Sequence, residues 1–363
     1  MEKTVRRPVT SNDLPRLLTL HVFPGQFPFS FLDYQLLCKA EMVCRRWQTL
    51  VIALMRREIH ELAVEKFYEL SPLILHLKSF RRLILSCPID AFDLLAGVLR
   101  RSRSSITNLR ADIRFFAKLN YIRVDKEERR KYFPNLEDLW ILIVDCDNEV
   151  TSEFLAIEDQ LFNEINSLTL QVQVMSDSYD NVAKVVNALI SWHTIASIKL
   201  EFHAPISSMV FEQLLRINSL TATQIKMICN DFDLPPLCLN YLCTILKERN
   251  IRTRNLVVRD WTIIVDPSSP IFAHPIDILR ISSCTIDSVN DFVESLRVTV
   301  NQVKKSAVTQ KETFYVKKLE IAGHCSFRGL QFLENNAHVE LERRLKMTVP
   351  DIEVDCKDIY YWW

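Results

Sequence analysis

Apolar and polar residues alternate in short runs along most of this chain, and from Phe80 onward an amphipathic stretch follows each run. Alternation with a period of two is typical of strands, and apolar residues three or four apart are typical of one helix face. The predicted strands are centred on Leu83 and Leu85, Leu109, Leu139 and Ile141, Leu168 and Leu170, Ile198 and Leu200, Ile225, Leu256 and Val258, Leu279 and Ile281, Leu319 and Ile321, and Ile352 and Val354. Their spacing, mostly about 30 residues, indicates a structural repeat.

The stretches between these strands predict helices, most clearly over 91–101, 151–165, 179–192, 237–249 and 289–304. A strand followed by a helix at this period is typical of a leucine-rich-type solenoid, in which each unit buries its apolar edge by stacking on its neighbours. Cys87, Cys146 and Cys284 follow three of the strands, at the turn where such repeats place Asn or Cys. The alternative is one compact α/β domain.

The first part of the chain has a different pattern, which predicts three short helices. Asp13 can cap a helix that Pro24 and Gly25 end. Apolar residues at helical spacing then run from Leu32 to Trp47, and a third amphipathic stretch covers 48–67. We therefore predict an α/β protein with a small helical unit over 1–67, followed by a strand–helix solenoid over 68–363.

The charge and glycine counts argue against several classes of function. Lys and Arg together number 45, as do Asp and Glu, so the chain lacks the net charge that favours binding to nucleic acid or to an anionic membrane. Only four glycines are present, whereas phosphate-binding loops and dinucleotide folds need clustered glycines. No apolar run approaches the roughly 20 residues that span a bilayer. We expect a soluble protein, cytoplasmic or nuclear or both, without nucleic-acid or membrane partners.

Residue spacing gives no sign of a metal site or of a catalytic centre. The ten cysteines are scattered without a C-x-x-C pair, and the eight histidines are mostly tens of residues apart. We expect reduced, mostly buried thiols. Nucleophile elbows and metal-ligand pairs are also missing from the sequence. The sequence therefore predicts a protein that is not an enzyme, with no catalytic residues, no metal and no cofactor.

An ordered set of motifs near the N-terminus carries a family resemblance. They are Leu14-Pro15, Leu17-Leu18, Val22-Phe23 and the run Val43-Cys44-Arg45-Arg46-Trp47-Gln48-Thr49-Leu50. This segment resembles the F-box, and the closing run is its most specific part. Between Pro28 and Val43 the chain is a few residues longer than the usual box. The low glycine count and the divergent repeats are similar to those of the expanded nematode F-box families.

The resemblance implies a substrate-recognition subunit of an SCF-type (Skp–cullin–F-box) ubiquitin ligase. The box would bind a helical groove on a Skp-family adaptor and reach a cullin through it. The implied adaptor-binding residues are Leu14, Pro15, Leu17, Leu18, Val22, Phe23, Leu32, Leu36, Val43, Cys44 and Trp47. The alternative is a leucine-rich-like repeat scaffold for protein–protein interaction that has no association with a ligase.

The alternation within the predicted strands also indicates which side chains could contact a target protein. Residues beside the apolar positions would face the open, concave side of a solenoid. The candidate substrate-binding residues are Trp140, Gln171, Lys199, Arg259, Trp261 and Arg280. Trp140 is expected to project to that side, where an exposed indole is a typical binding hot spot. The alternative is an indole packed against the neighbouring strand or against a covering loop.

Overall fold

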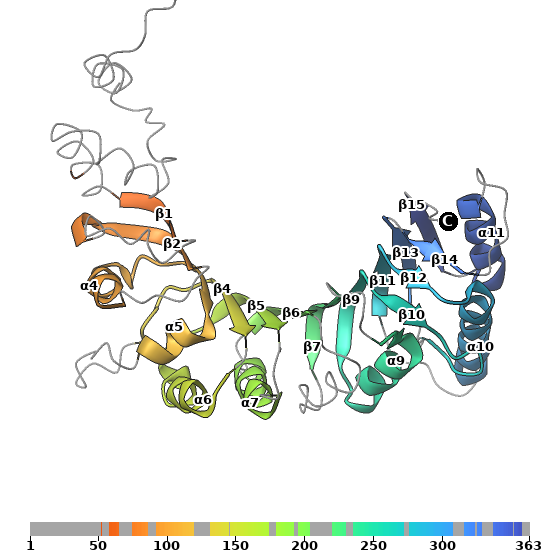
Figure 1. The fold of residues 1–363 in the computed structure, drawn as a ribbon, viewed down its shortest axis with the longest axis horizontal. Coiled ribbons are helices and arrows are strands. Elements are labelled where there is room, and N and C mark those ends of the chain that lie inside the picture. Colours follow the sequence, from red (N-terminus) through yellow and green to blue (C-terminus); the bar gives the residue numbers. More distant parts are fainter. Residues whose placement is uncertain are drawn as a thin grey trace, which may run out of the picture. The chain divides into compact units, whose positions relative to one another are not determined.

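In a computed structural model, the chain divides into two compact units (Figure 1). The first comprises Met1–Ala111, Ile122–Leu136 and Leu161–Asn163, and the second comprises Asp112–Tyr121, Glu137–Gln160 and Glu164–Trp363. The structure describes residues 52, 58–64, 75–85, 92–119, 131–144, 146–173, 179–191, 195–203, 220–229, 235–271, 276–307, 316–323, 325–328, 337–350 and 352–357. Within these ranges, no helix is both long enough and apolar enough to cross a membrane.

The first unit contains a small parallel sheet and a helix. Its elements are β1 (Glu58–Val64), β2 (Ser79–Leu85), α4 (Phe92–Ser102) and β3 (Asn108–Asp112). β2 pairs in parallel with both β1 and β3. Phe80 and Leu83 on β2 and Val98 on α4 are fully buried, because the helix packs its apolar face on the sheet. Arg101, at the end of α4, donates hydrogen bonds to the backbone carbonyls of Leu75 and Leu77.

Strand β1 corrects part of the predicted N-terminal helical unit. The third amphipathic stretch was expected to be helical over 48–67, but Glu58–Val64 is a strand with Leu62 opposite Leu83 on β2. Ile59 and Leu62 lie three apart, as in a helix, whereas Leu62 and Val64 lie two apart, as in a strand. Pairing with β2 decides between the two spacings, since it buries Leu62 and Val64. The domain boundary at 67/68 stays a prediction.

The second unit is built on a longer parallel sheet. In sheet order its strands are β4 (Asp138–Val144), β5 (Ile165–Gln173), β6 (Ile195–His203), β7 (Thr221–Ile228), β9 (Arg252–Arg259), β11 (Ile276–Ser282), β13 (Lys318–Ala322) and β15 (Glu353–Lys357). Every neighbouring pair in this order is parallel. A smaller parallel sheet has the order β14 (Ser326–Phe327), β12 (Thr285–Ile286), β10 (Thr262–Ile264) and β8 (Leu237–Cys238).

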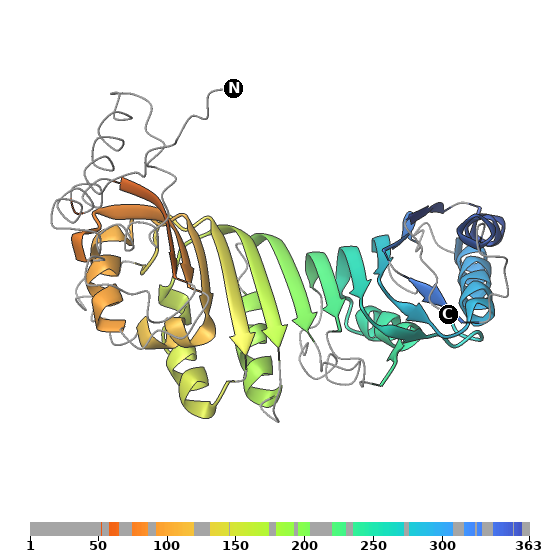
Figure 2. The ribbon, with the colours of Figure 1, turned by 45° about the horizontal axis from the view of Figure 1, so that its top comes forward.

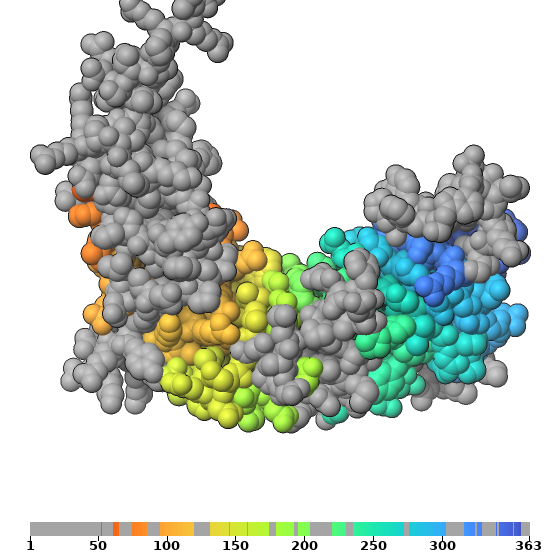
Figure 3. All heavy atoms as spheres, in the orientation of Figure 1, coloured from red at the N-terminus to blue at the C-terminus, as the bar shows by residue number. Residues whose placement is uncertain are grey.

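Helices cover one side of this longer sheet (Figures 1 and 2). They are α5 (Ile113–Lys118), α6 (Asn148–Leu155), α7 (Tyr179–Ile190), α9 (Leu239–Glu248), α10 (Val289–Ala307) and α11 (Ala337–Thr348), with a short 3-10 turn, η5 (Glu158–Gln160). In the space-filling view, residues of α6 and α7, coloured yellow to green, form part of the lower surface (Figure 3). The helices among the described residues therefore leave the other side of this sheet uncovered (Figure 2).

Local sequence explains where two of the helices begin. The carboxylate of Asp147 accepts a hydrogen bond of 2.8 Å from the backbone N–H of Val150, which caps α6. Asp112 caps α5 in the same way through the N–H of Arg114. Burial raises the pKa of Asp112, and the backbone hydrogen bond and the charge of Arg114 oppose that rise. Both helices therefore start where an aspartate satisfies an unpaired N–H group.

The α/β class predicted from the alternation is confirmed. Every predicted strand centre falls in a strand of the structure except Ile352, which lies one residue before β15, and the architecture is compatible with a strand–helix solenoid. Helices predicted over 91–101, 179–192, 237–249 and 289–304 are also found, although Leu237 belongs to β8. The helix predicted over 151–165 is corrected, because the Asp147 cap starts α6 at Asn148 and Ile165 already belongs to β5.

Candidate protein-binding face

Successive residues along the strands of the second unit point to opposite sides of its long sheet. One set, which includes Leu139, Ile141 and Leu168, is at most 1% exposed and packs on the helix-covered side. The other set projects from the side opposite the helices, and we call this side the open face. Because the strands are in register, its residues form rows across the sheet.

Three rows follow from the strand register. The first contains Trp140, Thr169, Lys199, Gln224, Asn255, Ile278, Lys318 and Glu353; the second contains Leu142, Gln171, Glu201, Lys226, Val257, Arg280, Glu320 and Asp355; the third contains Val144, Gln173, His203, Ile228, Arg259, Ser282, Ala322 and Lys357. On strands β4 and β5 the rows carry apolar and neutral polar side chains, and from β6 onward they also carry charges.

The structure brings five of the six candidate substrate-binding residues onto the open face: Trp140, Gln171, Lys199, Arg259 and Arg280. Arg259 and Arg280 each expose 51% of their side chains. Trp140, Gln171 and Lys199 are half-buried. Their use in binding a target stays a prediction.

Trp261 is the sixth candidate, and its expected position is corrected. It is only 3% exposed and follows β9 at a turn. Its backbone carbonyl accepts a hydrogen bond from the N–H of Thr285, and the carbonyl of Cys284 likewise accepts from Ser326. Trp261, Cys284 and Cys325 thus occupy matching turn positions between the two sheets. The turn directs Trp261 into the interior, so it is unavailable on an open surface.

Two of the cysteines noted in the sequence can be placed at strand ends. The thiol of Cys284 lies 3.2 Å from the carbonyl oxygen of Ser282, at the end of β11. Cys284 and Cys146 are buried, and burial raises the pKa of the Cys284 thiol far above its usual range. These thiols therefore act as small buried groups beside turn backbone atoms. Cys87 lies outside the described residues.

Charged residues of β6 and β7 meet in the middle of the open face. A carboxylate oxygen of Glu201 lies 3.9 Å from Nζ of Lys226, and its other oxygen lies 3.9 Å from Nε2 of His203. The side chains of Glu201 and Lys226 are 17% and 24% exposed, respectively. Partial burial makes such charges more dependent on their neighbours than fully exposed ones.

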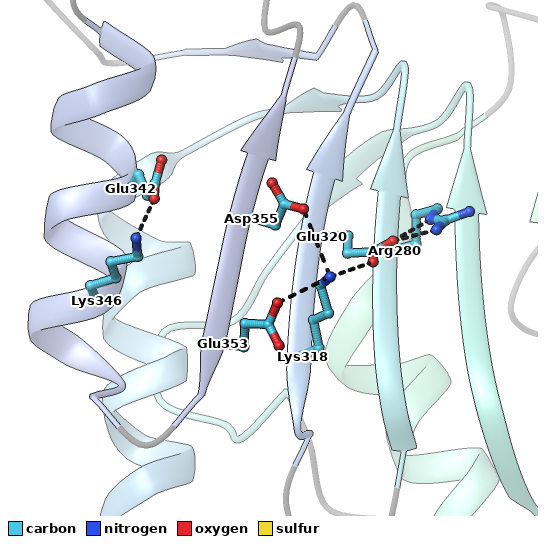
Figure 4. Close-up of polar contacts among 7 residues, drawn as sticks. All are labelled: Arg280, Lys318, Glu320, Glu342, Lys346, Glu353 and Asp355. Atoms are coloured by element: carbon cyan, nitrogen blue, oxygen red, sulfur yellow. Dashed lines mark hydrogen bonds and ion pairs between the residues drawn. The ribbon is translucent and has the colours of Figure 1, made fainter.

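A denser ion-pair network lies on β11, β13 and β15 (Figure 4). Arg280 contacts Glu320 at 2.6 Å through Nε, and Lys318 lies 3.1 Å from both Glu320 and Glu353 and 3.7 Å from Asp355. Burial raises the pKa of Glu320, but hydrogen bonds from Arg280 and Lys318 outweigh burial and hold it below its usual value. Hydrogen bonds to Glu320 and Glu353 raise the pKa of Lys318. The network neutralises most of its own charge.

Several open-face residues were missing from the candidate set: Lys226, Lys318, Glu353 and Asp355. The same alternation could have found them, because each of them is next in sequence to an apolar strand residue: Ile225, Leu319 or Val354. The sequence did not show that these side chains align across strands, since strand register depends on the tertiary fold.

The implied adaptor-binding residues, from Leu14 to Trp47, lie outside the described residues. Among the residues that the structure describes, no three His, Cys, Asp or Glu side chains converge as metal ligands. The candidate site within the described residues is therefore the open face of the second unit, a surface of mixed charge suited to contacts with another molecule.

Comparisons with known proteins identify a relative. No family model matches the chain. The chain is 40% identical to an uncharacterized F-box protein of Caenorhabditis elegans, in an alignment that covers 92% of this chain and 95% of the relative. Identity at this level over nearly the full length of both chains shows common family membership.

Proposed function

Because the chain belongs to the F-box protein family, we propose that it is the substrate-recognition subunit of an SCF-type ubiquitin ligase. The observation that carries the proposal is the 40% identity to an F-box protein over 92% of the chain. In this proposal the N-terminal box binds a Skp-family adaptor, which links the chain to a cullin. The chain itself catalyses no reaction and works in the cytoplasm, the nucleus or both.

The second part of the proposal concerns the target protein. The long parallel sheet would be the leucine-rich-like repeat region, and its open face would hold the target. Two features support this use. The described helices of the unit leave this face uncovered (Figure 2), and the face presents Trp140 together with charged side chains in aligned rows. Aromatic and arginine side chains are enriched at protein-binding hot spots.

The test is direct binding of the purified full chain to a Skp-family adaptor. A variant with Leu14→Ala and Pro15→Ala should lose binding while keeping its circular dichroism spectrum, since anchors at helical spacing provide the contact with the adaptor groove. Leu155→Ala is the matched control, because Leu155 is a 36% exposed leucine on α6, outside the box. It should bind as the wild type does.

Two results would count against the proposal. A well-folded wild-type chain that does not bind the adaptor would favour a repeat scaffold without a ligase. Equal loss of binding in the Leu155→Ala control would mean that the effect on the adaptor is not specific to the box motifs.

A further inference from the structure

A strip of basic residues crosses the middle of the open face. Four successive strands each contribute one cation: Lys199 on β6, Lys226 on β7, Arg259 on β9 and Arg280 on β11. We call these four residues the basic strip. On the same face of these four strands, among the described residues, Glu201 is the sole carboxylate. Positive charge therefore exceeds negative charge on this part of an otherwise neutral chain.

The four cations differ in how well neighbouring carboxylates neutralise them. Arg259 lies 3.0 Å from Asp260, and Arg280 contacts Glu320 at 2.6 Å. The ion pair between Lys226 and Glu201 is longer, with 3.9 Å between Nζ and the nearer carboxylate oxygen. For Lys199 the described part of the chain provides no ion pair, although its side chain is half-buried. A partly buried ammonium without a counter-charge is favourably placed to accept an anionic ligand.

The register fixes the spacing within the strip. Lys199 on β6 lies opposite Gln224 on β7, and Lys226 lies two residues after Gln224 on β7. The two lysines are therefore diagonal neighbours whose backbones lie about 7–8 Å apart. Lys226 and Arg280 share a row with Val257 between them, which separates them by two strand spacings, or about 10 Å. An extended peptide rises about 3.3 Å per residue, so carboxylates two or three residues apart match both separations.

Apolar side chains lie at both ends of the lysine pair, and Trp140 is the more exposed of them. Trp140 lies in the row of Lys199, with Thr169 between them. Val257 is 7% exposed between Lys226 and Arg280, where the aliphatic stems of long cationic side chains can cover it. A ligand that crosses the strip would therefore meet cations beside the half-buried indole of Trp140.

We propose that the basic strip binds an acidic, extended segment of the target protein, with carboxylates at every second or third position and an apolar side chain near Trp140. This rests on the proposed function for the role of the open face in holding targets, and it adds the chemical class of the target. Lys199 and Lys226 bind the carboxylates, because they are the least neutralised cations of the strip. Glu201 opposes the ligand and limits its affinity.

The first experiment measures binding of a labelled synthetic peptide to the full chain by fluorescence anisotropy. In this probe glutamate alternates with serine, and one serine is replaced by leucine. A second probe carries glutamine in place of every glutamate. The acidic probe should bind in a salt-sensitive manner, and the glutamine probe should bind at least about tenfold more weakly, because charge complementarity provides the recognition.

Two variants of the strip should change this affinity in opposite directions. Lys199→Gln combined with Lys226→Gln should weaken binding of the acidic probe about tenfold. Glu201→Gln should strengthen it a few-fold, since it removes the opposing carboxylate. The matched control is Lys184→Gln combined with Lys247→Gln, which changes the net charge equally but on exposed positions of α7 and α9. This control should bind as the wild type does.

Several outcomes would overturn the inference: equal binding of both probes, equal weakening in the two double-lysine variants, or tighter binding of a single-stranded oligonucleotide of the same charge. Adaptor binding is measured on the same preparations. A chain that binds the adaptor but not the acidic probe keeps the proposed function and loses this inference. A chain that binds the acidic probe but not the adaptor loses the proposed function alone.

Discussion

Left-handed backbone recurs just after three strands of the second unit. Asp260, Ser283 and Gly323 follow β9, β11 and β13 and have φ of 60°, 53° and 72°. The N–H of Asp260 bonds to the carbonyl of Ser282, and the N–H of Ser283 bonds to that of Ala322, so the first two turns are tied to the next strand. Single residues therefore set the direction in which the chain leaves the long sheet for the small one.

Gly323 gives the first prediction at this scale. A Cβ placed there would lie 3.0 Å from Oγ of Ser283, and an L side chain rarely adopts its backbone conformation. We expect Gly323→Ala to lower the free energy of unfolding by about 1–2 kcal/mol, measured by urea denaturation.

The matched control for Gly323 is another glycine-to-alanine change. Gly97 lies within helix α4, where, among the described residues, a Cβ would meet only Leu75 at 3.9 Å. We expect Gly97→Ala to leave stability unchanged or to raise it by up to about 1 kcal/mol. Equal destabilisation by both substitutions would contradict the role assigned to the left-handed turn.

At the scale of elements, a buried amide joins a loop to two helices. Asn240 on α9 is 5% exposed and donates to the carbonyl of Ser269 at 2.8 Å and to Oγ of Ser295 on α10 at 3.0 Å. Its carbonyl oxygen accepts from the N–H of Asp266 at 2.8 Å. One side chain thus bonds polar groups of the loop and of the helix, and Oγ of Ser295 also donates to the carbonyl of Ser269.

Removal of this amide should be costly. We expect Asn240→Ala to lower the free energy of unfolding by about 1–3 kcal/mol, because it removes hydrogen bonds to Ser269 and Ser295 and takes from the N–H of Asp266 the carbonyl oxygen that it bonds. Asn163→Ala serves as the comparison, since Asn163 makes an exposed hydrogen bond of 3.1 Å to the carbonyl of Pro134. Asn163→Ala should change the free energy of unfolding by no more than about 0.5 kcal/mol. Similar losses in both variants would argue against a special role for the buried network.

The ion-pair network between β11, β13 and β15 predicts a pH dependence. The folded-state pKa of Glu320 lies below its ordinary value of 4.5, so its contribution to stability is present above that value and is lost as the pH falls through the folded-state pKa. We expect Glu320→Gln to be less stable than the wild type at neutral pH. The difference in free energy of unfolding between the two proteins should shrink when denaturation is repeated in increasingly acidic buffer. A difference that stays constant with pH would contradict a stabilising role for the ionised Glu320 side chain.

At the scale of the molecule, the second unit is a stack of strands in which each contacts mainly its neighbours. Such stacks can lose structure from an end before the middle unfolds, because a terminal strand has one neighbour instead of two. Buried cysteines distributed along the stack can report this process. Cys229 follows β7 in its interior, and Cys325 follows β13, next to the last strand β15.

The fourth prediction is an order of thiol reactivity in urea. Native Cys229 and Cys325 should react slowly with a maleimide, because both are buried. As urea rises, we expect Cys325 to become reactive at a lower concentration than Cys229, as measured by mass spectrometry of labelled peptides. Cys238, which is partly exposed, is the control and should react in native buffer. Identical midpoints for Cys229 and Cys325 would indicate that the unit unfolds as a single block.

The sequence by itself determined the strand centres, most of the helices and the α/β class. This succeeded because a strand that buries one face repeats its apolar residues with a period of two, and a helix that buries one face repeats them with a period of about 3.6 residues. The same alternation placed Trp140, Gln171, Lys199, Arg259 and Arg280 on a common face before any strand pairing was known. The motifs near the N-terminus pointed to the family that the relative identifies.

Only the tertiary structure decided which of these residues meet. Register across β6 and β7 sets Lys226 beside Glu201, and register across β11 and β13 sets Arg280 beside Glu320, although 40 residues separate that second pair. Trp261 was misplaced because a left-handed turn at Asp260 ends the alternation there. Strand β1 was missed because its spacing suits a helix equally well until it pairs with β2. Pairing and turns between distant segments depend on long-range contacts, which local periodicity does not record.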